Sequence, residues 1–169
     1  METFIRTEAF TVYALRNPSQ RKVETLNAHS RTVIDAEGLI LGRMASVVAK
    51  RLLEGERIEI VNAEGAVVSG KRKQVIKERK EFLEVGGPKH GPIHYRKPNA
   101  IVRRTVRGML PRRKPRGRDA YRRLRVHIGV PRELSGVEAE SIKDAHVDRL
   151  RGRYITVGEI AKNIGWKVI

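Results

Sequence analysis

A dense run of guanidinium groups between Arg103 and Val126 is the first candidate for chemistry in this sequence. Eleven of these twenty-four residues are Lys or Arg, and Asp119 is the single carboxylate among them. The planar side chain of arginine can bind a phosphate through two parallel hydrogen bonds. The segment therefore predicts contact with a polyanion such as RNA or DNA, and a merely solvated charged surface is the alternative.

A second candidate is a phosphate-binding loop, suggested by GAVVSGKR from Gly65 to Arg72. The full motif is G-x-x-x-x-G-K followed by Ser or Thr, whose hydroxyl holds Mg²⁺. Arg72 occupies the hydroxyl position here, and the apolar residues 66–68 favour a strand where the motif needs a loop. Nucleotide hydrolysis is therefore disfavoured. Gly70 and Lys71 instead predict the start of a basic helix, whose free N–H groups could meet an RNA phosphate.

The remaining polar residues do not form a recognisable catalytic or metal site. His90 and His94 lie in a Gly- and Pro-rich loop without a third ligand at suitable spacing, so chance loop histidines are favoured. Asp35 and Glu37 follow a strand, where catalytic carboxylates occur in α/β folds, but turn formation explains them as well. The sequence contains no Cys, which excludes disulfides and thiolate metal sites. We predict no enzyme activity, no metal and no cofactor.

The overall charge also favours a nucleic-acid partner. The 169 residues carry a formal net charge of +17, and 40% of them are hydrophobic, enough for a folded domain. Residues 71–125 hold twenty basic and four acidic side chains, so nearly the whole excess lies there. No apolar run approaches the roughly 20 residues that span a bilayer, and the N-terminus lacks a signal-peptide pattern. We expect a cytoplasmic protein that binds a polyanion.

The elements that must position these cations follow from the apolar spacing. Strands are predicted at 32–35, 57–61, 66–69 and 125–128. Helices are predicted from Leu41 to a C-cap at Gly55, then at 71–85, 99–110 and 116–124, and finally from Thr156, with Glu159 completing a capping box. Strand, helix and strand with brief connections indicate a parallel βαβ unit. The residues expected to be mostly buried are Val33, Ile34, Val48, Leu52, Ile60, Val67, Val126 and Ile160.

Two of these helices are basic and amphipathic. On 99–110 the apolar face comprises Val102, Thr105, Val106 and Met109. The cations of that helix point away from this face. Gly108 suggests a close approach by another backbone. On 71–85 the inner face comprises Val75, Ile76, Phe82 and Leu83. Residues 1–31 show no periodic face and are expected to be an N-terminal extension, mobile or in contact with RNA or a neighbour, ahead of a domain at 32–169.

The predicted RNA-binding residues come from three basic segments, at 71–80, 89–97 and 103–123. Tyr95 could stack on an unpaired base or pack on its own domain, whereas core packing is favoured for Tyr121. The full predicted set is Lys71, Arg72, Lys73, Lys77, Lys80, Lys89, Tyr95, Arg96, Lys97, Arg103, Arg104, Arg107, Arg112, Arg113, Lys114, Arg116, Arg118, Arg122 and Arg123.

Four stretches, read in order, match one known family. They are VIDAEGLILGRMAS (33–46), IVNAEGAVVSGKR (60–72), RRTVRGMLPRRKPRGRDAYRRLRVHIG (103–129) and TVGEIAKNIGW (156–166). Over about residues 31–169 the chain resembles the universal large-subunit ribosomal protein thirteen family in its archaeal form. The resemblance implies a three-layer α/β/α domain around a small, mainly parallel four-stranded sheet. It also implies binding to large-subunit ribosomal RNA, support of subunit assembly, neighbouring ribosomal proteins as partners, and no catalysis.

The residues ahead of the first strand depart from this pattern, because archaeal relatives usually start only a few residues before it. A free regulatory RNA- or DNA-binding protein with the same basic surface remains the alternative function. Sedimentation with large ribosomal subunits separates the two.

Overall fold

The computed structural model describes residues 31–87, 91 and 94–167. The chain divides into two units, Met1–Ser30 and Arg31–Ile169, and every element below belongs to the second unit. The predicted N-terminal extension lies outside the described residues except for Arg31, the first residue of β1.

A three-stranded parallel sheet forms the centre of the domain. Its strands are β1 (Arg31–Asp35), β2 (Arg57–Val61) and β4 (Leu124–Val126), in the order β1-β2-β4. Helix α3 (Leu41–Glu54) connects β1 to β2 and ends at Gly55, which adopts the left-handed conformation with φ 109°. This conformation costs little only for glycine. The predicted βαβ unit is confirmed.

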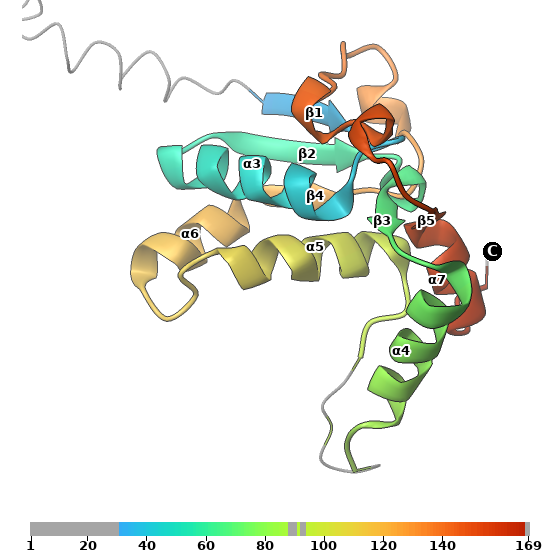
Figure 1. The fold of residues 1–169 in the computed structure, drawn as a ribbon. Coiled ribbons are helices and arrows are strands. Elements are labelled where there is room, and N and C mark those ends of the chain that lie inside the picture. The colour runs from blue at the N-terminus through green and yellow to red at the C-terminus, as the bar shows by residue number, and fades with distance from the viewer. Residues whose placement is uncertain (1–30, 88–90, 92–93, 168–169) are drawn as a thin grey trace, which may run out of the picture. The chain divides into compact units, whose positions relative to one another are not determined.

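Two layers cover the sheet. Ile34, Ile58 and Ile60 lie on one face and join the main core with α3 and α5 (Pro98–Met109). On the other face Val33 and Val61 pack against Leu134, in the first of three 3₁₀ turns at Arg132–Leu134, Lys143–Ala145 and Val147–Arg149. Figure 1 shows α3 and α5 on one side of the strands. The turn at Lys143–Ala145 also reaches α3, since Ala145 joins the main core. The predicted three-layer α/β domain is confirmed, with short 3₁₀ turns in the third layer.

A second, smaller core lies beside the main sheet. Strand β3 (Val67–Ser69) pairs antiparallel with β5 (Tyr154–Thr156), and helices α4 (Arg72–Glu84) and α7 (Val157–Asn163) pack on them. Val75, Ile155 and Ile160 are its buried residues. In Figure 1 helix α4 leads away from the sheet, with its first turn beside α7.

The parallel sheet has three strands, whereas four were predicted. The predicted strand at 66–69 leaves the parallel sheet and pairs with β5. The fourth segment beside the parallel strands is a single bridge, in which the Asp35 N–H donates to the Glu140 carbonyl (3.1 Å) and the Glu140 N–H donates to the Val33 carbonyl (2.8 Å). Strand β5 itself was not predicted.

Seven of the eight predicted core residues are buried, and Val126 is half-buried at the end of the edge strand β4. The strand predicted at 125–128 is shorter and begins one residue earlier, since β4 spans Leu124–Val126. Two residues expected on the apolar faces of helices are exposed. Met109 is exposed because α5 ends there and Leu110 takes the buried position. Phe82 is 43% exposed because the end of α4 extends past α7 and β5.

The predicted capping box of the last helix is half present. The Glu159 N–H donates to the Thr156 hydroxyl oxygen at 3.2 Å, which satisfies one free N–H group at the start of α7. The Glu159 carboxylate does not complete the reciprocal bond and instead pairs with Arg72 of α4. This residue therefore links two helices that are distant in sequence.

Candidate nucleic-acid interface

Helix α5 presents three arginines on a well-anchored surface. Pro98 occupies its first turn, where the missing N–H is tolerated, and Val102 and Val106 are completely buried. Arg103 and Arg104 are exposed and Arg107 is half-buried. Among the described residues no carboxylate lies within ion-pair distance of these guanidinium groups. Their charge is therefore available to an external anion.

A cation–π contact orients one of these arginines. The Arg103 guanidinium carbon lies 4.8 Å from the centre of the Tyr121 ring. The half-buried Tyr121 also packs against the main core, as predicted. Stacking on the ring restricts the side chain and leaves the N–H groups of its guanidinium free to donate.

The turn between α5 and α6 (Pro115–Arg122) spreads further cations over the surface. This turn is where two backbones approach closely, since a Cβ on Gly117 would lie 2.3 Å from the Pro111 carbonyl oxygen. The expectation that another backbone lies close to Gly108 is wrong for this domain, because no atom lies within 4 Å of a Cβ built at Gly108. The exposed cations of the turn and of the first half of α6 are Arg112, Arg113, Lys114, Arg116 and Arg118.

The last two predicted cations of this segment differ from each other. Arg122 is exposed and contacts Asp119 at 3.5 Å. Arg123 is half-buried, and its Nη2 donates to the Leu52 carbonyl of α3 at 2.7 Å. Arg123 thus adds a second donor to a carbonyl in the last turn of α3, which also accepts from the Gly55 N–H at 3.3 Å. Its Nη2 is therefore engaged within the domain.

Helix α4 carries a second set of cations, partly balanced by its own carboxylates. Lys71 is the exposed N-cap, and Lys73 and Lys80 are exposed. Lys77 lies 3.7 Å from Glu81, and Arg72 forms the ion pair with Glu159. This helix therefore presents less free positive charge than its Lys and Arg content suggests.

The segment before α5 adds Arg96 and Lys97, both exposed, and Tyr95, which is 46% exposed. Lys89, also predicted to bind RNA, lies outside the described residues. We use the term basic surface for the predicted cations of these segments that are exposed, together with the half-buried Arg107 and without Arg72, which pairs with Glu159. Its members are Lys71, Lys73, Lys77, Lys80, Arg96, Lys97, Arg103, Arg104, Arg107, Arg112, Arg113, Lys114, Arg116, Arg118 and Arg122.

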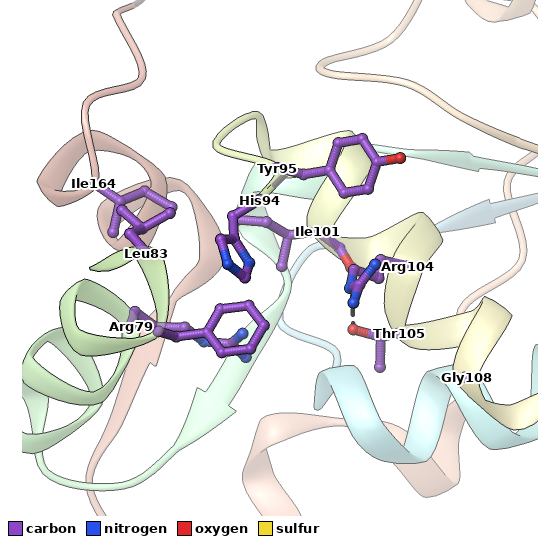
Figure 2. A pocket seen from close by; sticks show the side chains of 10 residues that line it. Arg79, Leu83, His94, Tyr95, Ile101, Arg104, Thr105, Gly108 and Ile164 are labelled. Carbon is purple, nitrogen blue, oxygen red and sulfur yellow. Dashed lines mark hydrogen bonds between the residues drawn. The ribbon is translucent and has the colours of Figure 1, made fainter. Parts of the chain in front are cut away.

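A cleft of about 250 Å³ lies between α4, α5, α7 and the segment at 94–95. Figure 2 shows Arg79 and His94 on one side of it and Arg104 and Thr105 on the other. Arg79 is a half-buried residue that the sequence interpretation missed. The signal was its position three residues after Ile76 and four before Leu83, on the inner face of α4.

Comparison with known proteins identifies the family. Residues 29–133 match the family model described as ribosomal protein L13. The chain belongs to this family. It is 51% identical over 138 residues to the large ribosomal subunit protein uL13 of Archaeoglobus fulgidus, covering 80% of this chain and 88% of that one. The same identity relates it to the protein of that name from Methanosarcina barkeri, with 80% and 99% covered.

A third relative agrees. The uL13 protein of Methanopyrus kandleri is 46% identical over 140 residues, covering 81% of this chain and 88% of the relative. The resemblance to the archaeal form of the family, drawn from four short stretches, is confirmed. No helix within the described ranges is long and apolar enough to cross a membrane.

In this member of the L13 family, the backbone conformation of residues 65–72 rules out a nucleotide-binding loop. Val67–Ser69 form strand β3, where a nucleotide-binding loop would have to wrap a phosphate. Asp35 serves the turn after β1, since its Oδ1 accepts from the Glu37 N–H and the Asn62 side-chain amide, both at 3.0 Å. Asp35 therefore has the turn role that the sequence left open beside a catalytic one.

The two loop histidines, for which a chance occurrence was favoured over a metal site, are described only in part. His90 lies outside the described residues. His94 Nε2 donates to the Val85 carbonyl oxygen at 3.1 Å, and its ring meets the Phe82 ring edge-on at 4.1 Å between centroids. No group of three or more potential metal ligands occurs among the residues that the structure describes.

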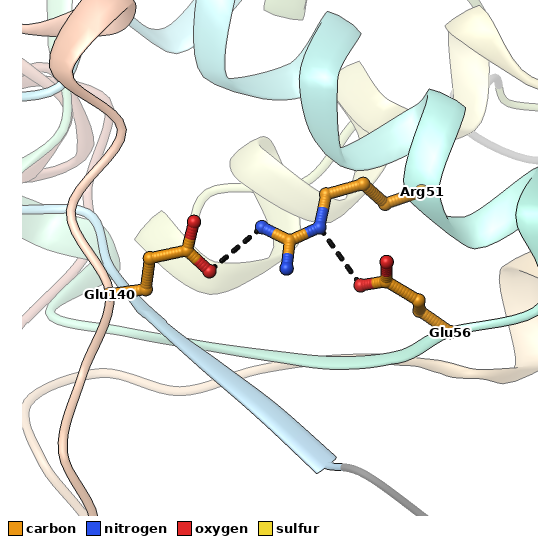
Figure 3. Close-up of polar contacts among 3 residues, drawn as sticks. All are labelled: Arg51, Glu56 and Glu140. Carbon is orange, nitrogen blue, oxygen red and sulfur yellow. Dashed lines mark hydrogen bonds and ion pairs between the residues drawn. The ribbon is translucent and has the colours of Figure 1, made fainter. Parts of the chain in front are cut away.

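One cluster of charge is structural. Arg51 of α3 donates to Glu56 at 2.8 Å and to Glu140 at 2.9 Å (Figure 3). Burial lowers the pKa of Arg51, but the hydrogen bonds and charges of Glu140 and Glu56 outweigh burial and raise that pKa overall. The cluster ties the end of α3 to the segment bridged to β1, so Arg51 is not part of the basic surface.

Proposed function

We propose that this chain is a structural component of the large ribosomal subunit and binds large-subunit ribosomal RNA through the basic surface. The observation that carries the proposal is the arginine row of α5. Arg103 and Arg104 are exposed, Arg107 is half-buried, and none of the three has a carboxylate partner among the described residues. The opposite side of the helix is buried in the core. Such a surface can bind phosphates through charge attraction, and binding does not require the entropy cost of ordering the helix.

Family membership supports the same role. The matched relatives are named large ribosomal subunit protein uL13. We infer that this chain acts in the cytoplasm as part of the ribosome and contacts neighbouring large-subunit proteins. We also infer that it has no enzyme activity and no small-molecule substrate. Support of subunit assembly follows from a rigid scaffold that neutralises several RNA segments at once.

Sedimentation of the tagged full chain from its native cells tests the proposal. At physiological salt, we expect the protein in the large-subunit fraction and in whole ribosomes. A free regulatory RNA- or DNA-binding protein would remain near the top of the gradient or follow other nucleic acids. Ribonuclease treatment is the control, because it should release the protein if RNA contacts hold it there.

A further inference from the structure

The cleft between α4 and α5 combines exposed aromatic rings with two arginines. The residues that matter are Arg79, Phe82, His94, Tyr95, Arg104 and Gly108. Leu83, Ile101 and Ile164 supply apolar lining. A cleft with an apolar lining and a few polar groups at its edge is the usual form of a binding site.

Its aromatic rings are unusually open to solvent for a protein with few aromatic residues. Phe82 is 43% exposed and Tyr95 is 46% exposed. The His94 ring is fixed by its hydrogen bond to Val85 and by its edge-on contact with Phe82, at an interplanar angle of 64°. Exposed aromatic side chains gathered around one cavity indicate that a partner covers them.

The charge of the cleft favours an anionic partner. Arg79 and Arg104 line it, and no carboxylate does. Neither arginine forms an ion pair with another described residue. A larger cleft beside Trp166 lacks this character, because Glu64 and Glu159 line it together with lysines. An anion with a planar apolar part fits the first cleft, and a nucleotide has both features.

We propose that this cleft binds the base of one unpaired nucleotide of large-subunit ribosomal RNA. The base stacks on the rings of Phe82 and Tyr95, and its phosphate lies against Arg79 or Arg104. A volume of about 250 Å³ is large enough for a single base. Proteins commonly recognise RNA through unpaired bases stacked on aromatic side chains. The inference rests on the proposed function, which supplies the RNA.

Ring removal is the first test, with transcribed large-subunit ribosomal RNA as the probe. Base stacking on an aromatic ring contributes enough that its loss weakens binding about 5- to 150-fold. We expect that loss for the double variant Phe82→Leu and Tyr95→Leu, which keeps apolar bulk but removes both rings. The exchange variant Phe82→Tyr and Tyr95→Phe keeps both rings and should bind normally. Tyr154→Leu removes an equally exposed ring outside the cleft and should also bind normally.

The salt dependence separates stacking from phosphate contacts. Loss of the rings should leave the slope of log affinity against log salt unchanged, because no cation is removed. Thermal melting without RNA should show that the double variant is folded, since both rings are largely exposed. Unchanged RNA affinity in a folded double variant would overturn the cleft proposal.

Gly108 allows an independent steric test. A Cβ at Gly108 meets no atom within 4 Å, and this residue lines the cleft. Gly108→Leu should fill the cleft without changing charge and should strengthen α5, because Leu has a higher helix propensity than Gly. We expect weaker RNA binding of the same order. Gly108→Ala is the matched control, which raises helix propensity but leaves most of the space open.

Ultraviolet cross-linking then shows where the RNA lies. After irradiation of the complex, mass spectrometry should find nucleotide adducts on peptides that contain Phe82, His94 or Tyr95, and Gly108→Leu should abolish them. Adducts on α5 and α6 peptides alone would overturn the cleft proposal while leaving the proposed function intact. Failure of the unaltered chain to bind the RNA would overturn both.

Discussion

Helices α4 and α5 are both basic and amphipathic, but the domain holds them very differently. Helix α5 buries Ile101, Val102 and Val106, and it packs on α3, β4 and α7. Helix α4 buries only Val75 and packs mainly on α7 and β5. The two helices have similar sequence patterns, but α5 packs in the main core and α4 is anchored only near its first turn.

Their charges differ in the same way. Helix α5 has three arginines and no carboxylate, whereas α4 has Glu78, Glu81 and Glu84 among its cations. Intrahelical pairs such as Lys77–Glu81 support an exposed helix that receives little help from packing. The comparison teaches that rigid packing and free charge occur together on α5, which makes it the stronger candidate for phosphate binding.

The largest expected effect comes from removing the α5 cations. Replacement of Arg103, Arg104 and Arg107 by Gln should weaken RNA binding on the order of 1,000-fold, if each charge-assisted contact contributes about 1.5 kcal/mol. The salt slope should fall by roughly 2–3 units. Titration of large-subunit RNA at several salt concentrations measures both.

The matched variant on the other helix replaces Lys73, Lys77 and Lys80 by Gln. We expect a smaller loss of affinity and of slope, because Lys77 already contacts Glu81. Equal losses for the two triple variants would show that packing does not determine which helix binds phosphate. Unfolding of the α5 variant would show that its arginines are structural, although the described contacts include only the Tyr121 stack of Arg103.

The second effect concerns stability. Val102→Ala in α5 should lower the free energy of unfolding by about 2–3 kcal/mol, since it removes two buried methyl groups and leaves a cavity. Phe82→Ala in α4 removes a larger side chain but should cost less than about 1 kcal/mol, because that ring is nearly half exposed. Urea denaturation monitored by circular dichroism compares them. A cost of about 3–5 kcal/mol for Phe82→Ala would indicate a buried ring.

These two residues also mark how far the sequence could predict the fold. The spacing of apolar residues around Ile34, Val48 and Ile60 correctly predicted β1, α3 and β2, because all three residues are buried within one contiguous βαβ unit. Phe82 was misplaced because periodicity identifies an apolar face but not whether a partner covers all of it. The partners of α4 come from β5 and α7, far along the chain, and no local pattern specifies that contact.

The candidate site shows the same limit. Composition and spacing identified the exposed arginines of α5, because charge and helical period are local properties. They could not predict that the Arg123 side chain points toward α3, because this orientation depends on a hydrogen bond to the Leu52 carbonyl in that helix. They also could not identify the cleft, because Arg79 and Arg104 are brought together only by tertiary packing.

Arg122 and Arg123 give a third contrast, because Arg122 is exposed to solvent and Arg123 donates a hydrogen bond to α3. Arg123→Gln should lower the free energy of unfolding by about 1–2 kcal/mol, because it removes a charge-assisted hydrogen bond to α3. Arg122→Gln should change stability by less than about 0.5 kcal/mol and act, if at all, on RNA binding. Melting both variants without RNA and titrating both with RNA measures the two effects. The reverse ranking in stability would contradict the inward position of Arg123.

The smallest expected effect tests how α4 is anchored. Arg72 and Glu159 join the first turn of α4 to α7, and their side chains are 60% and 37% exposed. An ion pair this exposed contributes only about 0.2–1 kcal/mol. A double-mutant cycle of Arg72→Gln and Glu159→Gln should give a coupling in that range. Global unfolding should change little, because the main core excludes both residues.

Local opening should respond more clearly than global unfolding. Amide hydrogen exchange in α4 should accelerate in either single variant, while exchange in α3 and α5 stays unchanged, since α4 can open without the main core. Lys77→Gln is the matched control, because its pair with Glu81 lies within α4 and does not tie the helix to α7. If Arg72→Gln and Lys77→Gln accelerate exchange equally, the ion pair adds nothing to the anchorage, and Val75 with its apolar neighbours holds α4 alone.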